Sequence, residues 1–171
     1  MERLTEIDAA PKTLDSLPEW ALVTSRPSGK LYWTAAVRLN GILGGGVSIR
    51  FATPADVWEL DVYGHIEVAI PALGPRRLRL NPAEWRPRSD HRNQMWVPAP
   101  HSLATYKDRW HPFDLNKERG VTIFLQGSAG AAVPLPDDID SFSDYLHFCG
   151  AIWKCPDVEK VPPPPWSRRL V

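Results

Sequence analysis

Three histidines at ten-residue intervals, His91, His101 and His111, are the side chains of this sequence best suited to acid–base chemistry. Imidazole exchanges a proton near neutral pH, so one histidine could serve as a general base and another as a general acid. A phenol and two cations lie between the second and the third histidine: Tyr106, Lys107 and Arg109. Because such cations hold phosphate groups, one hypothesis is a metal-independent ribonuclease. The spacing is equally typical of successive loops, and we favour a structural, hydrogen-bonding role for the three histidines.

The same histidines could bind zinc together with Asp90, Asp108 or Asp114, which is a further alternative. A close pair such as His-x3-His is absent, so we expect no metal site. The glycine-rich stretch at residues 41–46 lacks the Lys-Ser/Thr of a phosphate-binding loop and is better interpreted as a hairpin. We therefore expect no cofactor.

A basic, tryptophan-rich segment is the strongest binding candidate. The chain as a whole carries 20 Lys and Arg against 20 Asp and Glu, but residues 76–119 contain ten against five, a local net charge of +5. The candidate binding residues within it are Arg86, Arg88, Arg92, Trp96, Arg109 and Trp110. Tryptophan and arginine are enriched at protein interfaces, and they also stack on nucleic-acid bases. Because +5 is modest against a phosphate backbone, the segment favours a non-enzymatic protein that binds a protein partner, with RNA as the alternative.

Alternating apolar and polar residues predict an antiparallel sheet with one face exposed to solvent. The 18 prolines argue against long helices. We expect strands at residues 20–25, 30–39, 47–51, 57–62, 66–70, 77–80 and 121–125. Turns are expected at residues 26–29 and at Asn40 followed by Gly41. Apolar residues at helical spacing between Ile139 and Trp153 predict one main helix. The fold class is therefore α+β, a bent antiparallel meander with a C-terminal helix packed on it.

The expected organisation is an N-terminal arm at residues 1–19, a single domain at 20–156 and a proline-rich tail at 157–171. His65 is interpreted as a surface or core residue, and Cys149 as a small, inert core residue. No apolar run is long enough to span a bilayer, and residues 1–11 lack the apolar centre of a signal peptide, so we expect a cytoplasmic protein without a membrane partner. The zero net charge makes self-association into a homo-oligomer a further expectation.

The order of several short motifs resembles a loose group of small, functionally uncharacterised bacterial proteins. The resemblance covers residues 77–152 and rests on His91 and Asn93, on Pro100 followed by His101, and on the helix pattern Phe142, Tyr145, Leu146 and Cys149. It implies an α+β architecture and an accessory role in mobile-element, defence or toxin–antitoxin loci. It implies no particular activity.

Overall fold

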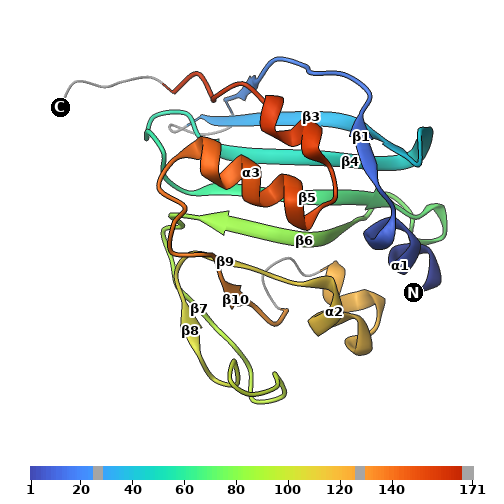
Figure 1. The fold of residues 1–171 in the computed structure, drawn as a ribbon, viewed down its shortest axis with the longest axis vertical. Helices are drawn as coiled ribbons and strands as arrows, with labels where there is room; N and C mark the ends of the chain where they lie inside the picture. Colours follow the sequence, from blue (N-terminus) through green and yellow to red (C-terminus); the bar gives the residue numbers. More distant parts are fainter. Residues whose placement is uncertain (25–28, 126–129, 167–171) are drawn as a thin grey trace.

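An eight-stranded antiparallel sheet forms the centre of the computed structural model, which describes residues 1–24, 29–125 and 130–166 (Figure 1). The strands follow the order β1-β3-β4-β5-β6-β9-β10, and β2 also pairs with β3. Their bounds are Lys12–Leu14 (β1), Ala21–Val23 (β2), Lys30–Leu39 (β3), Ile42–Pro54 (β4), Val62–Ala69 (β5), Arg77–Trp85 (β6), Arg109–Trp110 (β9) and Val133–Pro134 (β10). A separate two-stranded sheet pairs β7 (His91–Arg92) with β8 (Thr105–Tyr106).

One face of the sheet is covered by helix α3 (Phe142–Ile152), as Figure 1 shows. Ser141 caps the helix: its hydroxyl accepts a hydrogen bond from the backbone N–H of Asp144, whose carboxylate accepts one from the backbone N–H of Ser141. The stripe that predicted the helix is buried at Phe142, Leu146, Cys149 and Trp153. The expected α+β class, an antiparallel sheet with a C-terminal helix packed on it, is confirmed.

The remaining helical segments are short. Within the described ranges they are α1 (Glu2–Ala9), α2 (Phe113–Asn116) and four 3-10 turns, η1 (Pro71–Leu73), η2 (Lys117–Arg119), η3 (Val121–Phe124) and η4 (Pro156–Lys160). Among the described residues, no helix is long and apolar enough to cross a bilayer.

Aromatic side chains fill the core between α3 and the sheet. The ring of Phe51 lies 5.9 Å from Trp33 and 5.4 Å from Trp153, while Tyr145 stacks on Trp85 at 5.9 Å. Gly64 allows this packing, because a Cβ there would lie 2.6 Å from Phe51 and 2.8 Å from Trp153. The sheet and the helix are thus joined through a close-packed aromatic layer.

The hairpin between β3 and β4 turns as expected at Asn40 and Gly41, whose φ angles are 51° and 79°. Two successive positive φ angles are typical of the type I′ turn, which matches the twist of paired strands. The turn expected at residues 26–29 includes positions outside the described residues, but the strands on either side of it, β2 and β3, do pair.

Two expected strands are wrong. Residues 57–61 form bends and a turn, where Glu59 and Asp61 have positive φ angles of 48° and 56°. Residues 121–124 form the 3-10 turn η3, and Phe124 stacks on Phe113 at 5.4 Å. An apolar run this short does not distinguish a strand from a helical turn, and here the contact with Phe113 decides the outcome.

Both ends of the described chain contribute to the core. Leu4 and Ile7 of α1 are buried, and β1 pairs with β3. Val158 and Val161, in and after η4, belong to the same hydrophobic cluster. The segments expected as an arm and a tail are therefore packed on the sheet as far as residue 166.

Candidate functional site

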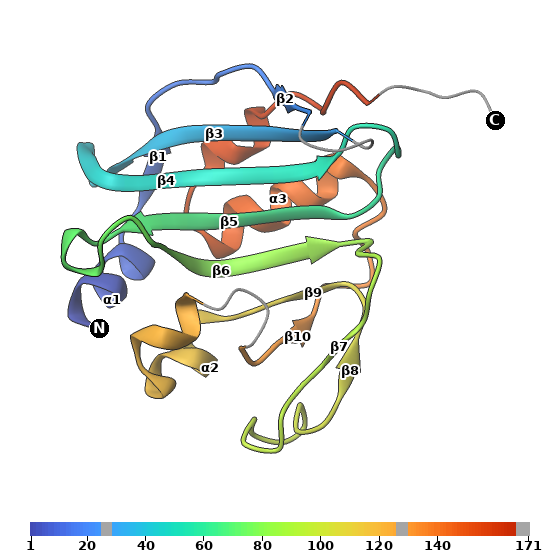
Figure 2. The ribbon, with the colours of Figure 1, turned by 180° about the vertical axis from the view of Figure 1, so that it is seen from behind.

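Helix α3 lies behind the sheet in Figure 2, and we call the face of the sheet that is turned toward the viewer there the open face. Strand register aligns side chains across it in rows. One row runs through Tyr32, Ala52, Tyr63, Glu84 and Arg109, on five neighbouring strands. The next rows hold Arg50 opposite His65, and Glu67 opposite Arg79. Residues far apart in the sequence thus form a continuous polar surface.

A cavity of about 430 Å³ lies in the open face, and we call it the sheet-face cavity. Its lining includes three acids, Asp61, Glu67 and Glu84. Each acid has an arginine partner: Arg88 lies 3.7 Å from Asp61, Arg50 lies 3.6 Å from Glu67, and Arg109 lies 2.5 Å from Glu84.

Two cations of the lining, Lys30 and Arg79, have no ion pair within the described part of the chain. Arg79 lies over the ring of Tyr63, with 5.8 Å from its Cζ to the ring centroid. Each acid of the lining is therefore in an ion pair, whereas Lys30 and Arg79 are cations of the lining that are not.

His65 and Tyr63 bring unpartnered polar atoms to this cavity. Neither ring nitrogen of His65, a residue only 3% exposed, nor the buried hydroxyl of Tyr63 makes a hydrogen bond of ordinary length among the residues described, although a carboxylate oxygen of Glu67 lies 4.0 Å from Nε2 of His65 and the Arg79 guanidinium lies beside Tyr63. Burial lowers the pKa of His65 below its ordinary value and raises the pKa of Tyr63 to about 12. Both side chains are therefore neutral near pH 7, and buried polar atoms without hydrogen bonds are uncommon in folded proteins.

A second cluster surrounds Glu84 at the edge of the cavity. The Nε2 atom of His111 lies 3.6 Å from Oε1 of Glu84, and the rings of His91 and His111 meet edge to face at 5.0 Å. Burial alone would raise the pKa of Glu84, but the nearby His111 and Arg109 outweigh it, so the carboxyl has a lowered pKa. Burial, His111 and Arg109 together lower the pKa of His91.

The structure thus brings two of the three predicted histidines together. His101 instead contacts the Tyr106 hydroxyl through Nδ1 at 2.7 Å. Lys107 is exposed on the loop between β8 and β9. Among the described residues, no group of three or more His, Cys, Asp or Glu side chains is arranged to hold a metal ion.

Arg109 has an internal role. It is 3% exposed, and besides Glu84 its guanidinium donates to the backbone carbonyls of Ser89, Tyr106 and Lys107. These bonds hold together the two ends of the segment formed by residues 86–108, which we call the side lobe. A guanidinium used in this way has little capacity left for a ligand.

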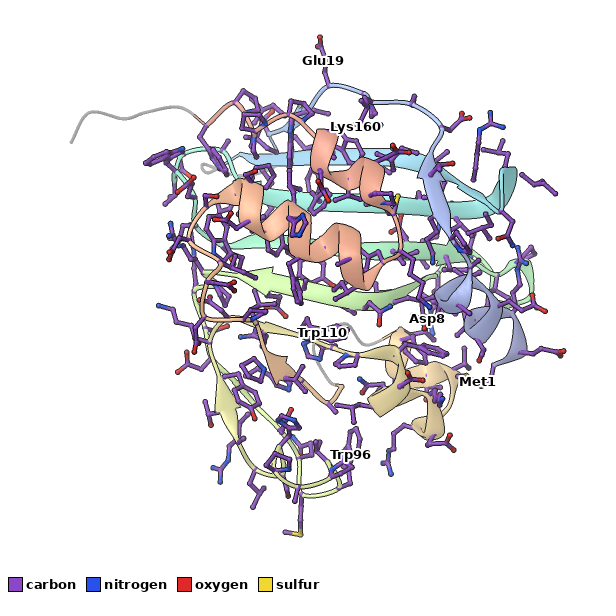
Figure 3. All side chains as sticks on the ribbon, viewed as in Figure 1. Met1, Asp8, Glu19, Trp96, Trp110 and Lys160 are labelled. Carbon is purple, nitrogen blue, oxygen red and sulfur yellow. The ribbon has the colours of Figure 1, made fainter. Side chains whose placement is uncertain are left out.

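The other predicted binding residues are divided between the side lobe and the core. Arg86 lies over Trp85 at 4.4 Å and donates to the carbonyl of Asp140, while Arg88 and Arg92 are exposed. Trp110 packs edge to face on Phe148 at 5.9 Å, and Trp96 lies 4.8 Å beneath Arg119. Figure 3 shows Trp110 close to the sheet and Trp96 far out in the side lobe. These residues do not form one surface.

Sequence reasoning missed the sheet-face cavity. The alternation expected at residues 66–70 and 77–80 placed Arg77 and Arg79 on the face away from Leu78 and Leu80, but it did not single out His65 or Glu67. What it could not supply was the register that aligns Arg50 with His65 and Glu67 with Arg79. The interpretation of His65 as an ordinary surface or core residue therefore overlooked its neighbours.

Comparisons of the chain with protein-family models, with curated proteins and with solved structures gave no match. The resemblance to small bacterial proteins, and the mobile-element or defence role that it implies, stay predictions.

Proposed function

We propose that this protein is a binding protein whose sheet-face cavity takes an anionic ligand. The observation that supports the proposal is the set of unpartnered polar atoms of His65 and Tyr63 in a cavity where the acids already have arginine partners. Arg79 would supply the charge for the anion, and the neutral His65 and Tyr63 side chains would supply hydrogen bonds.

Physical arguments favour a ligand over a purely structural role. A buried polar atom without a hydrogen bond costs about 1–3 kcal/mol of stability, and the cavity carries three such atoms on two neighbouring residues. A ligand that satisfies them recovers this cost on binding. Arg79 is exposed and close to both residues, so an anion can reach it from solvent.

The test is isothermal titration calorimetry with inorganic phosphate and pyrophosphate as probes. We expect saturable binding to the wild type, and a loss of about tenfold or more in affinity in Arg79→Gln, because a charge-assisted hydrogen bond contributes about 1.5–3 kcal/mol. Arg77→Gln is the matched control, since Arg77 is exposed on the same strand but outside the cavity lining. Absence of binding, or equal losses in the two variants, would contradict the proposal.

A protein partner at the side lobe is a second candidate. The supporting observation is the exposure of two large apolar side chains there, Met95 at 79% and Leu103 at 46%. Exposed apolar groups on the same segment as the exposed Arg88 and Arg92 are typical of an interface. The test compares the proteins captured from a native lysate by the wild type and by Met95→Asp/Leu103→Asp. A partner that both capture equally would contradict this candidate.

A further inference from the structure

A proline-rich segment at residues 162–166 follows η4, and we call it the proline segment; in Figure 1 it is the red coil after η4. It consists of four prolines and one tryptophan, and it belongs to neither sheet. Three of the prolines are exposed, and only Pro164 is buried. The buried core ends just before it, at Val161. The proline segment therefore lies on the folded domain much as a bound peptide would.

The surface beneath the proline segment is formed by three side chains from distant parts of the chain, and we call it the docking surface. They are Trp20 just before β2, Thr53 on β4 and Phe142 at the start of α3. The ring centroids of Trp20 and Phe142 are 6.3 Å apart. Strand pairing positions β2 and β4, and the Ser141 cap positions the start of α3. The elements that carry the docking surface thus form without the proline segment.

Each end of the proline segment makes one hydrogen bond to the docking surface. The indole N–H of Trp20 donates to the carbonyl of Pro162 at 2.8 Å. The indole N–H of Trp166 donates to the hydroxyl of Thr53 at 3.2 Å, and its ring meets that of Phe142 edge to face at 5.7 Å. The docking surface therefore contacts both a proline carbonyl and a tryptophan ring.

These contacts are of the kind that recognises proline-rich chains. Proline has no backbone N–H, so its carbonyl is free to accept from a partner, and the indole N–H of tryptophan is a donor only. Proteins that bind proline-rich chains use grooves lined by aromatic side chains, because such chains are already extended and lose little entropy on binding. The backbone N–H of Trp166 donates to the carbonyl of Pro164 at 2.8 Å, and this tight turn brings the indole back toward Phe142.

The proline segment is held by few bonds. Within the described part of the chain, no backbone-to-backbone hydrogen bond joins it to another segment, because prolines cannot donate to a sheet. Its attachment consists of the side-chain contacts of Trp20, Thr53 and Phe142 described above. A segment attached in this way can be replaced by another of the same chemistry without unfolding the domain.

We propose that the docking surface binds a proline-rich segment of a partner protein, and that the chain's own proline segment occupies it until the partner displaces it. The inference goes beyond the proposed function, since it concerns a peptide rather than an anion. The partner segment offers a proline carbonyl to Trp20 and, after further prolines, a tryptophan ring to Phe142. The proline segment competes at an effective concentration in the millimolar range, so it acts as an autoinhibitory contact.

The experiment measures, by fluorescence anisotropy, how a labelled hexapeptide with the sequence of residues 161–166 binds to the full chain. In Pro164→Ala/Trp166→Ala the proline segment loses its buried proline and its ring, while the docking surface is unchanged. We expect this double variant to bind the peptide about tenfold more tightly than the wild type, because the internal competitor is weakened. Pro163→Ala, at an exposed position, is the matched control and should bind as weakly as the wild type.

Trp20→Phe, added to the double variant, tests the docking surface. It keeps an aromatic ring and removes the N–H that donates to the proline carbonyl, so we expect about fivefold weaker binding of the peptide. Unchanged affinity would mean that the peptide binds elsewhere and would overturn the proposal. So would equal affinities for the wild type and the double variant, or no binding to either.

A measurement on the wild type does not depend on how the variants fold. In nuclear magnetic resonance spectra, the indole N–H signals of Trp20 and Trp166 should shift when the unlabelled peptide is added at several millimolar, because the peptide displaces the proline segment. Signals that stay in place would overturn the proposal.

A second copy of the chain is the other occupant that these contacts would fit. Analytical ultracentrifugation distinguishes it, and we expect both the wild type and the double variant to be monomers. A wild-type dimer that the double variant does not form would mean that two copies exchange their proline segments, and it would overturn the assignment to a partner protein.

Discussion

Asn93 and Asn116 bind consecutive residues of the same returning segment. The amide of Asn93 both accepts from the backbone N–H of Ala132 and donates to its carbonyl, at 2.8 and 2.7 Å. Asn116 forms the same pair of bonds with Ala131, at 2.7 and 3.0 Å. Each side-chain amide therefore forms the pair of hydrogen bonds that the backbone of a neighbouring strand would form. Together the two amides attach the segment before β10 to the side lobe and to α2.

Removal of one of these side-chain amides should lower the stability of the fold. In Asn93→Ala the buried backbone N–H and carbonyl of Ala132 lose their partners, while the carbonyl of His101 keeps only its bond from the N–H of Ala104, and we expect a loss of about 3 kcal/mol in the free energy of unfolding. Urea denaturation measures this loss. Gln94→Ala, at the exposed neighbouring position, is the control and should change stability by less than about 0.5 kcal/mol. Similar values for the two variants would show that the amide of Asn93 does not hold the segment.

Gly64 should tolerate no side chain. A Cβ at this position would collide with Phe51 and Trp153, so Gly64→Ala should lower the free energy of unfolding by about 1–3 kcal/mol through overpacking. Gly45→Ala is the matched control, because a Cβ there has nothing within 4 Å. Thermal unfolding of the two variants distinguishes them, and an unchanged melting temperature in Gly64→Ala would mean that α3 can shift away from the sheet.

Stability should fall in mild acid because of His65. Its folded-state pKa lies below that of an unfolded histidine, about 6.5, so the unfolded chain takes up the proton first. The free energy of unfolding therefore decreases as the pH drops below about 7, until the folded-state pKa is reached. The limiting slope is about 1.4 kcal/mol per pH unit for each such histidine, and His91 contributes in the same direction.

The measurement is urea unfolding of the wild type and His65→Gln across this pH range. We expect a smaller decrease in His65→Gln, since one of the two histidines no longer titrates. A decrease as large as that of the wild type would show that the pKa of His65 is the same in the folded and the unfolded state.

We expect no cleavage of single-stranded RNA by this protein. A ribonuclease of the kind considered from the sequence needs histidines and cations around one phosphate, whereas His101 pairs with Tyr106 and the guanidinium of Arg109 donates to internal carbonyls. Gel electrophoresis of end-labelled RNA after incubation with the protein tests this expectation. Cleavage that disappears in His91→Ala but persists in His147→Ala, an exposed histidine elsewhere, would instead assign the activity to His91.

The main elements of the fold could be predicted because their signals are local. Alternation in residues 30–39 and helical spacing after Ile139 each depend on neighbours within a few positions, and both elements form as expected. The strand expected at residues 57–62 fails because the chain must turn between β4 and β5, and the positive φ angles of Glu59 and Asp61 provide that turn. Alternation alone does not reveal where a strand must end.

The candidate site was less predictable because it depends on contacts between distant residues. The basic segment suggested Arg109 as a ligand-binding cation, but the side lobe folds back and uses its guanidinium for internal carbonyls. Conversely, Tyr32 and Ala52 carry no signal in the sequence. They become neighbours of Tyr63 only when three strands adopt one register.

Hydrogen bonds join the first twenty residues of the described chain to its last described segment, and this affects how the protein folds during synthesis on the ribosome. The backbone N–H of Lys12 donates to the carbonyl of Lys154, that of Leu14 to the carboxylate of Asp157, and the indole of Trp20 to the carbonyl of Pro162. When only about the first hundred residues have left the ribosome, β1 is already present but the residues that bond to it have not yet been made. The sheet edge at β1 is therefore completed late, by residues that are translated long after it.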